Sequence, residues 1–199
     1  MTPMFRTTLF ATLLLALPAG PAQAQAFQAG DNAVGIGVGV GGSYYRYGSY
    51  YGFRPTLSLL YDRGTAIPVG PGVLGIGGFF SYTNRRVYND YIYWVEDRRY
   101  DFWSFGLRGT YHWNSWHKVE NWDVYAGIGL GATITTRTDR STYSNTYYEN
   151  LYTRHFNARN PVRSSLFVGT RYYFTDFLGV FAEVGYDTAF LTGGLQLKF

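Results

Sequence analysis

The chain has 199 residues, no cysteine and a formal net charge of +4. The lack of cysteine excludes a disulfide framework, thiolate metal sites and a lipidated N-terminal cysteine. The net charge is too small to indicate a nucleic-acid partner.

The first residues have the pattern of a secretory signal. Arg6 precedes a mostly apolar run over residues 9–17, and Ala22-Gln23-Ala24 follows as an A-x-A cleavage site. The apolar run is too short to cross a bilayer as a helix, which needs about 20 residues. We therefore expect residues 1–24 to be a signal peptide and residues 25–199 to form one domain.

The rest of the chain contains segments in which every second residue is apolar. Alternation over about ten residues is typical of a strand with lipid on one side and a lumen on the other. A soluble β-sandwich would also alternate, but the signal and the aromatic residues at strand ends favour a membrane barrel. We predict an all-β fold, an eight-stranded antiparallel up-and-down transmembrane β-barrel. Its strands should cover residues 32–42, 54–61, 73–82, 100–113, 122–134, 163–174, 180–186 and 191–199.

The lengths of the connections predict the orientation of this barrel. With the N-terminus in the periplasm, the periplasmic turns are residues 62–72, 114–121 and 175–179. The longest connections then lie outside, as is typical of such barrels. These outer loops are residues 43–53, 83–99, 135–162 and 187–190.

The C-terminal third resembles a known group of membrane barrels. The stretch GTRYYFTD at 169–176 is followed by GVFAEVGY at 179–186, and the chain closes with LQLKF at 195–199. Together with the signal and the eight strands, these segments look like the small outer-membrane β-barrel superfamily, similar to OmpX and to the OmpA transmembrane domain. The resemblance implies insertion in the bacterial outer membrane by the assembly machinery, with Phe199 as its recognition signal. It implies no single activity, because this scaffold hosts several functions.

Five charged or titratable side chains have the parity that faces the lumen. A charge in this narrow space must be paired or hydrated. If Phe174 faces Val180 across the 175–179 turn, Arg171 lies opposite Glu183 and the two form an ion pair. Because an eight-stranded barrel is just wide enough to be filled by side chains, we expect a plugged core rather than an open pore. The predicted lumen cluster is Arg108, His112, Arg171, Glu183 and Lys198.

The histidines show no catalytic pattern. A nucleophile needs an adjacent base, yet none of His112, His117 and His155 belongs to the His-x-Ser pair that a resemblance to outer-membrane lipid A deacylases would require. The paired acids and the Asp-x-His of an omptin-like protease are also missing. No His, Asp and Glu cluster has the spacing of metal ligands. We therefore predict no catalytic residue, no metal and no cofactor.

The predicted outer loops are rich in tyrosine and arginine. Such a composition is typical of recognition surfaces, because the tyrosine ring gives contact area at low entropic cost. The same aromatics would also fit strand extensions and an outer girdle, and both interpretations remain open at this point. The candidate binding residues are Tyr44, Tyr45, Arg46, Tyr47, Tyr91, Trp94, Tyr147 and Tyr148.

The sequence thus predicts a monomeric, non-enzymatic outer-membrane barrel with a structural or surface-binding, adhesion-like role. Its expected partners are outer-membrane lipid and lipopolysaccharide, the assembly machinery and an unidentified extracellular ligand. A narrow channel for small solutes is the first alternative, and a lipid-modifying outer-membrane enzyme is the second.

Overall fold

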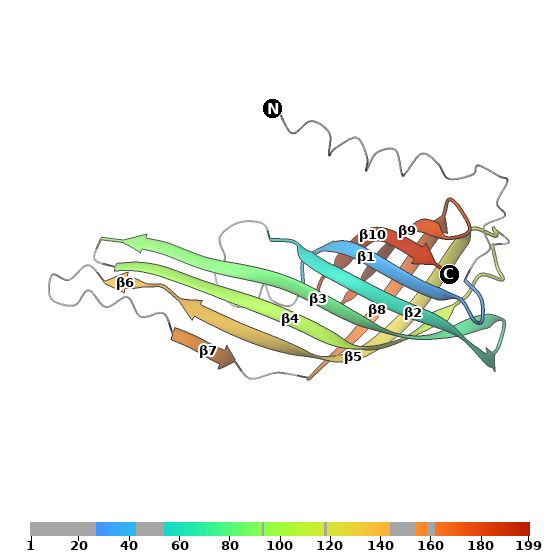
Figure 1. Cartoon of the computed structure of the whole chain (residues 1–199), viewed down its shortest axis with the longest axis horizontal. Coiled ribbons are helices and arrows are strands. Elements are labelled where there is room, and N and C mark those ends of the chain that lie inside the picture. Colours follow the sequence, from blue (N-terminus) through green and yellow to red (C-terminus); the bar gives the residue numbers. More distant parts are fainter. Residues whose placement is uncertain (1–26, 43–53, 93, 118, 144–153, 159–161) are drawn as a thin grey trace, which may run out of the picture.

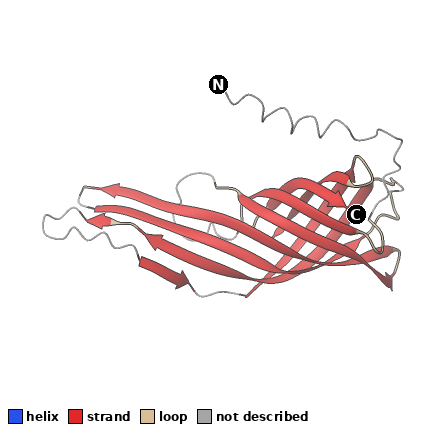
Figure 2. Ribbon diagram, in the orientation of Figure 1, coloured by secondary structure: helices blue, strands red, loops and turns tan. Residues whose placement is uncertain are grey.

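The computed structural model describes residues 27–42, 54–92, 94–117, 119–143, 154–158 and 162–199. The regular structure in these residues is all β-strand (Figure 2). Within the same residues no helix is long and apolar enough to cross a membrane. The predicted signal peptide, residues 1–24, lies outside the described residues.

Eight long strands form a closed antiparallel barrel (Figure 1), which confirms the predicted fold. Each strand pairs with the next, and the last pairs with the first to close the ring. Two short strands, β6 (Thr142–Tyr143) and β7 (Arg154–Ala158), pair with β4 and β5. The barrel strands are β1 (Asn32–Val40), β2 (Thr56–Val69), β3 (Gly72–Tyr91), β4 (Trp94–His112), β5 (Trp122–Asp139), β8 (Val162–Tyr173), β9 (Leu178–Tyr186) and β10 (Leu191–Lys198).

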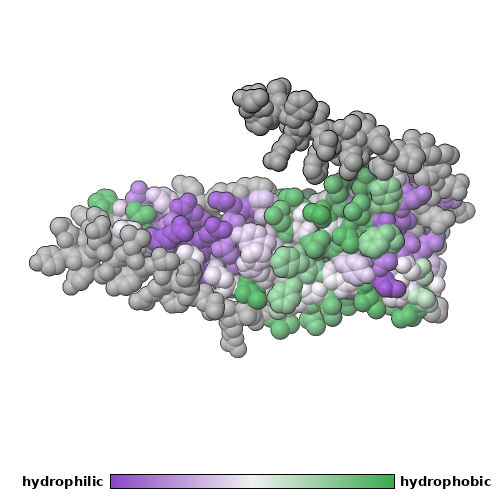
Figure 3. Space-filling model, in the orientation of Figure 1, coloured by the Kyte–Doolittle hydropathy of each residue, from purple (hydrophilic) through white to green (hydrophobic). Residues whose placement is uncertain are grey.

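The outer face of the barrel carries an apolar belt. Side chains that point outward are strongly exposed, with Leu107 at 72%, Ile36 at 67% and Leu166 at 64%. Figure 3 shows hydrophobic residues gathered across the visible face of the barrel, with hydrophilic residues beyond them on both sides. An exposed apolar surface of this extent needs lipid to cover it, and it alternates along each strand with an inward polar face. The molecule is therefore a transmembrane barrel.

Three barrel strands continue far beyond the belt. The ladder between β3 and β4 runs without a break from Val73–His112 to Tyr91–Trp94. The Tyr82–Trp103 pair is an aromatic pair of the kind found at a membrane interface. Nine further pairs lie beyond it, which at about 3.3 Å per residue is roughly 30 Å of strand. We name this part of β3, β4 and β5, together with β6 and β7, the sheet extension.

The predicted outer loop at 83–99 is therefore wrong, because residues 83–91 belong to β3 and residues 94–99 to β4, and the two strands pair as a hairpin. Outside the membrane neither face of a strand must be apolar, so the alternation that marks a strand in the sequence is lost. Polar cross-strand contacts stabilise the hairpin instead. Arg86 Nε donates to Asp97 Oδ1 at 2.7 Å, and Asn89 Nδ2 donates to Glu96 Oε2 at 2.9 Å.

The predicted turn at 62–72 is also too long. Strand β2 continues to Val69, with an irregularity in its pairing to β3 between Gly64 and Pro68. The turn itself is at Gly70, whose φ of 57° is in the left-handed region that favours glycine. Strand β2 therefore includes Asp62, which enters the lumen.

The barrel has two different ends. One carries the sheet extension, and the other carries the C-terminus and the short β2–β3 and β8–β9 turns (Figure 1). We call them the extended end and the turn end.

Candidate functional site

The five predicted lumen residues lie inside the barrel. Each of Arg108, His112, Arg171, Glu183 and Lys198 is at most 9% exposed. Glycines on neighbouring strands make room for large inward side chains. The Tyr125 ring, for example, lies where a Cβ at Gly169 would be. The interior is therefore filled by side chains.

A first cluster joins β4, β5 and β9. Arg108 Nη2 donates to Glu183 Oε1 at 2.5 Å, and the Tyr125 hydroxyl donates to the same oxygen at 2.7 Å. The Arg108 guanidinium also lies 4.1 Å from the centre of the Phe167 ring. A buried carboxylate with two donors and a stacked guanidinium form a compact plug across the lumen.

A second cluster lies nearer the turn end. Arg171 Nη2 donates to Asp62 Oδ2 at 2.8 Å, and Arg171 Nη1 is 3.5 Å from Asp123 Oδ2. The His112 ring bridges the two carboxylates, with Nδ1 2.9 Å from Asp123 and Nε2 3.2 Å from Asp62. The Thr110 hydroxyl donates to Asp62 Oδ1 at 2.9 Å. These five side chains from β2, β4, β5 and β8 fill this level of the barrel.

The predicted ion pair between Arg171 and Glu183 is wrong. Strand β9 begins at Leu178, two residues before the prediction, and Phe174 N–H donates to Leu178 O at 2.9 Å to close a tighter turn. Arg171 is therefore opposite Phe181 in the β8–β9 register. A two-residue shift preserves which face each side chain occupies, but it changes the partner of each charge.

The turn end is closed by residues that precede the first strand. Phe27 is 2% exposed and stacks on the His112 ring with centroids 4.1 Å apart. Asp31 Oδ2 lies 3.8 Å from Lys198 Nζ, whose ammonium is also 4.8 Å from the centre of the Tyr173 ring. Phe27 thus covers the second cluster from the turn end.

The second cluster includes an Asp–His–Thr arrangement, because His112 contacts Asp123 through Nδ1 and the Thr110 hydroxyl at 3.0 Å through Nε2. A catalytic triad would use the same order of contacts. Here the hydroxyl already donates to Asp62, and both Thr110 and His112 are 1% exposed. A substrate therefore has no access to them. Among the described residues no group of three His, Cys, Asp or Glu side chains could hold a metal ion.

The predicted lumen cluster did not include Asp62, Thr110, Asp123, Tyr125 or Phe27. Asp123 and Tyr125 have inward parity on the predicted fifth strand, so the alternation was a usable signal for both. Asp62 falls in a predicted turn. Phe27 precedes every predicted strand, so no pattern pointed to it.

Most of the predicted loop residues lie outside the described part of the chain, namely Tyr44, Tyr45, Arg46, Tyr47, Tyr147 and Tyr148. The two that are described are at the tip of the sheet extension. Tyr91 and Trp94 form the last β3–β4 pair, and their rings stack with centroids 4.5 Å apart. Tyr91 is 49% exposed, and Ile92 in the turn is 89% exposed. The tip therefore presents an aromatic pair and an aliphatic side chain to solvent.

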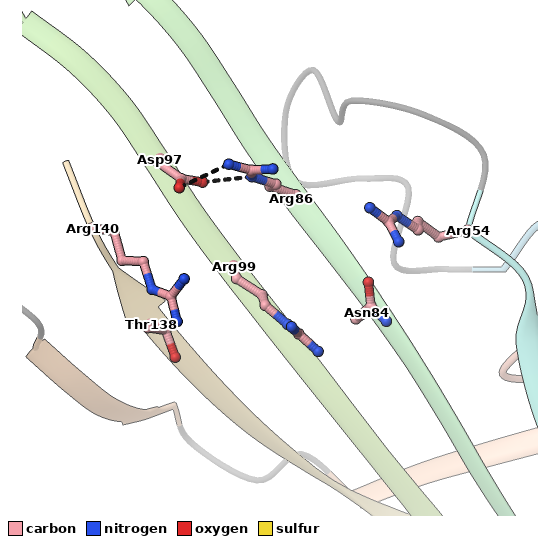
Figure 4. Close-up of a pocket in the computed structure, with 7 residues that line it drawn as sticks. All are labelled: Arg54, Asn84, Arg86, Asp97, Arg99, Thr138 and Arg140. Carbon is pink, nitrogen blue, oxygen red and sulfur yellow. Dashed lines mark hydrogen bonds and ion pairs between the residues drawn. The ribbon is translucent and has the colours of Figure 1, made fainter.

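A pocket of about 200 Å³ lies on the outer face of the sheet extension. Figure 4 shows that its arginines belong to separate segments: Arg86 is on β3, Arg99 is on β4 and Arg140 lies just after β5. Asp97 is the acidic residue in the lining, and it pairs with Arg86. Sequence patterns gave no signal for this pocket, because its residues fall mostly in predicted loops. The lining residues are Arg54, Asn84, Arg86, Asp97, Arg99, Thr138 and Arg140.

The pocket arginines keep their charge. The hydrogen bond to Asp97 raises the pKa of the Arg86 guanidinium. The pKa of the Arg99 guanidinium is also raised, mainly by its hydrogen bond to Tyr82 and in second place by its hydrogen bond to Asp101. No ion pair to Arg54 or Arg140 is present among the described residues. The pocket is therefore a cationic site with unneutralised charge.

Phe199 lies beside the seam that closes the barrel. Its backbone N–H donates to Asn32 O at 2.9 Å and its carbonyl accepts from Asn32 N at 2.8 Å, while its side chain is 73% exposed. Its predicted role as an assembly signal stays a prediction.

Comparison with solved structures finds Ail, the attachment invasion locus protein of Yersinia pestis. The complex of Ail with the heparin analogue sucrose octasulfate superposes with a TM-score of 0.49 at 12% identity, covering 86% of this chain and 100% of Ail. A second crystal structure of Ail gives a TM-score of 0.47 at the same identity and coverage. No family model and no curated protein sequence matches the chain.

Proposed function

We propose that this protein is a bacterial outer-membrane barrel with a surface-binding, adhesion-like role, carried by the sheet extension. In this proposal the extended end faces the outside of the cell, and residues 1–24 are removed during export. The assembly machinery recognises the strand that ends at Phe199, and the mature chain acts as a monomer.

The sheet extension is the observation that carries this proposal. A hairpin held in register over its whole length places its tip roughly 30 Å of strand beyond the aromatic pair at the interface. That reach places the tip beyond the lipid headgroups, where a partner at the cell surface can contact it. The filled lumen supports the same view, because a barrel with no free interior acts through its surface.

The tip has the composition of a protein-binding surface. Aromatic side chains contribute most of the energy in many interfaces, and an exposed aliphatic neighbour adds apolar contact area. Tyr91 and Ile92 combine both features at the end of the β3–β4 hairpin. The ligand class favoured by this tip is therefore a protein surface with an apolar groove.

The double change Tyr91→Ser and Ile92→Ser tests this role. Cells that display the variant should adhere to epithelial cells or immobilised extracellular-matrix glycoproteins about tenfold less than cells with the unaltered protein, because the loss of such anchors costs about that much in affinity. Adherence is counted at matched surface levels of barrel. The control is Val119→Ser, which removes an apolar side chain of 42% exposure at the turn end. Equal adherence by the tip variant and the control would refute the proposed role.

A further inference from the structure

The register of the strands gives the height of the cationic pocket relative to the aromatic residues at the membrane interface. On the outer face of β3, β4 and β5, Tyr82, Trp103 and Ile134 form one row of paired residues. Four residues further out on the same strands, Arg86, Arg99 and Thr138 form another. At about 3.3 Å per residue and a strand tilt of about 45°, the arginine row lies roughly 9 Å above the aromatic row. That is the headgroup level of the outer leaflet.

The aromatic and cationic rows are physically joined. Arg99 Nη2 donates to the Tyr82 hydroxyl at 3.1 Å, and the same hydroxyl donates to Asp101 Oδ1 at 2.6 Å. The Tyr82 ring itself lies 4.3 Å from the Trp103 ring. The side of these contacts nearer the apolar belt consists of the Tyr82 and Trp103 rings, and the side further from it is charged, as expected at a membrane boundary.

An apolar groove lies below the pocket on the same face. It runs over β3, β4 and β5 and reaches the start of β8. Gly78 has no side chain on this face, so the backbone is uncovered there between larger apolar side chains. The groove residues are Gly78, Phe79, Phe105, Gly106, Leu107, Leu130, Gly131, Ala132 and Val162. An acyl chain lying in this groove would bring its headgroup toward the arginines.

The arginines are arranged for an anion with several oxygens. Arginine binds phosphate through paired N–H donors, and several arginines around one space favour a group with more than one charge. Arg85 is 1% exposed, and its Nη1 donates a hydrogen bond to the backbone carbonyl of Arg54 at 2.5 Å. This contact fixes the backbone of Arg54. One wall of the pocket is therefore held in place before a ligand arrives.

We propose that this pocket binds a phosphate group of a glycolipid in the leaflet that surrounds the barrel, which on the outer face of an outer membrane is the lipid A part of lipopolysaccharide. The phosphate contacts Arg86, Arg99 and Arg140, and an acyl chain of the same molecule lies in the groove below. Bound lipid would hold the base of the sheet extension against the membrane. The assignment of the leaflet rests on the proposed orientation, whereas the tip plays no part in it.

The test is equilibrium binding of fluorescent bisphosphorylated lipid A to the folded barrel in a phosphate-free maltoside detergent. The double change Arg99→Gln and Arg140→Gln should weaken binding about ten- to a hundredfold, since a charge-assisted hydrogen bond to phosphate strengthens binding by roughly a factor of ten. The matched control is Arg98→Gln with Arg137→Gln. Arg98 lies on β4 and Arg137 on β5, on the opposite face of the sheet from the pocket, and each forms an ion pair with an acidic residue. The control should bind lipid A almost as well as the unaltered protein.

Two further ligands identify the source of the phosphate. Lipid A from which both phosphates have been removed should bind the unaltered barrel as weakly as intact lipid A binds the Arg99/Arg140 variant. Inorganic phosphate should displace lipid A only at far higher concentrations, because it cannot use the groove. Equal losses in both double variants, undiminished binding of the dephosphorylated lipid, or equal affinity for inorganic phosphate would each overturn the proposal. The tip variant Tyr91→Ser/Ile92→Ser should bind lipid A normally, so failure here is distinguishable from failure of the adhesion role.

Discussion

Replacing Asp62 with alanine is expected to destabilise the barrel by about 3 to 5 kcal/mol, the usual loss when one partner of a buried ion pair is removed. Asp62 is 1% exposed and accepts hydrogen bonds from Arg171 and Thr110. Without it, the ion pair that remains to the Arg171 cation among the described residues is the longer one with Asp123, at 3.5 Å. Urea unfolding in lipid vesicles, followed by tryptophan fluorescence, measures the loss.

The matched control is Asp101→Ala. Asp101 also pairs with an arginine, Arg99, but on the outer face of the sheet extension, where water solvates the charge that remains. Its removal should leave the unfolding midpoint almost unchanged. The change Asp62→Asn keeps the shape of the side chain but removes its charge. Its loss of stability should therefore lie between the losses of Asp62→Ala and Asp101→Ala. A loss for Asp62→Ala no larger than for Asp101→Ala would show that water reaches the lumen freely.

Replacing Glu183 with alanine should cost a similar amount, about 3 to 5 kcal/mol, because it leaves the buried Arg108 cation and the Tyr125 hydroxyl without their acceptor. The double change Arg108→Met/Glu183→Leu should recover part of the loss, since neither charge is then buried alone. Adding Tyr125→Phe should recover more, by removing the last group that needs Glu183. The same urea titration compares these variants.

The partner of Glu183 can be identified in the same series. Arg171→Met added to Glu183→Ala should destabilise further, because Arg171 serves the other cluster, with Asp62 and Asp123. Recovery of stability by Arg171→Met, and none by Arg108→Met, would restore the pairing expected from the sequence and contradict the observed register.

The strands within the membrane were predictable because lipid enforces alternation. Leu107 and Leu166 face outward while Arg108 and Phe167 face inward, as their positions in the sequence require. The same parity placed five of the lumen residues. What parity does not determine is the partner of each charge, since the partner depends on the length of a turn. An error of two residues at the start of β9 was enough to pair Arg171 with the wrong carboxylate.

The sheet extension was hidden for a different physical reason. Beyond Tyr82 and Trp103 neither face of the sheet has to be apolar, so polar residues such as Arg86, Asp97 and Arg99 occupy strand positions. Composition alone makes such a segment resemble a loop. The cationic pocket follows from the register between strands, which places residues far apart in the sequence in one row.

The central claim is that the barrel is closed and that the molecule acts at its surface. Planar-bilayer current through the purified, unaltered barrel tests this claim most directly, because the Arg108–Glu183 and Arg171–Asp62 clusters and Phe27 fill successive levels of the lumen. The account predicts a current equal to that of the protein-free bilayer over the whole voltage range. Reproducible single-channel steps that change size in the Glu183→Ala variant would contradict it and establish a solute channel.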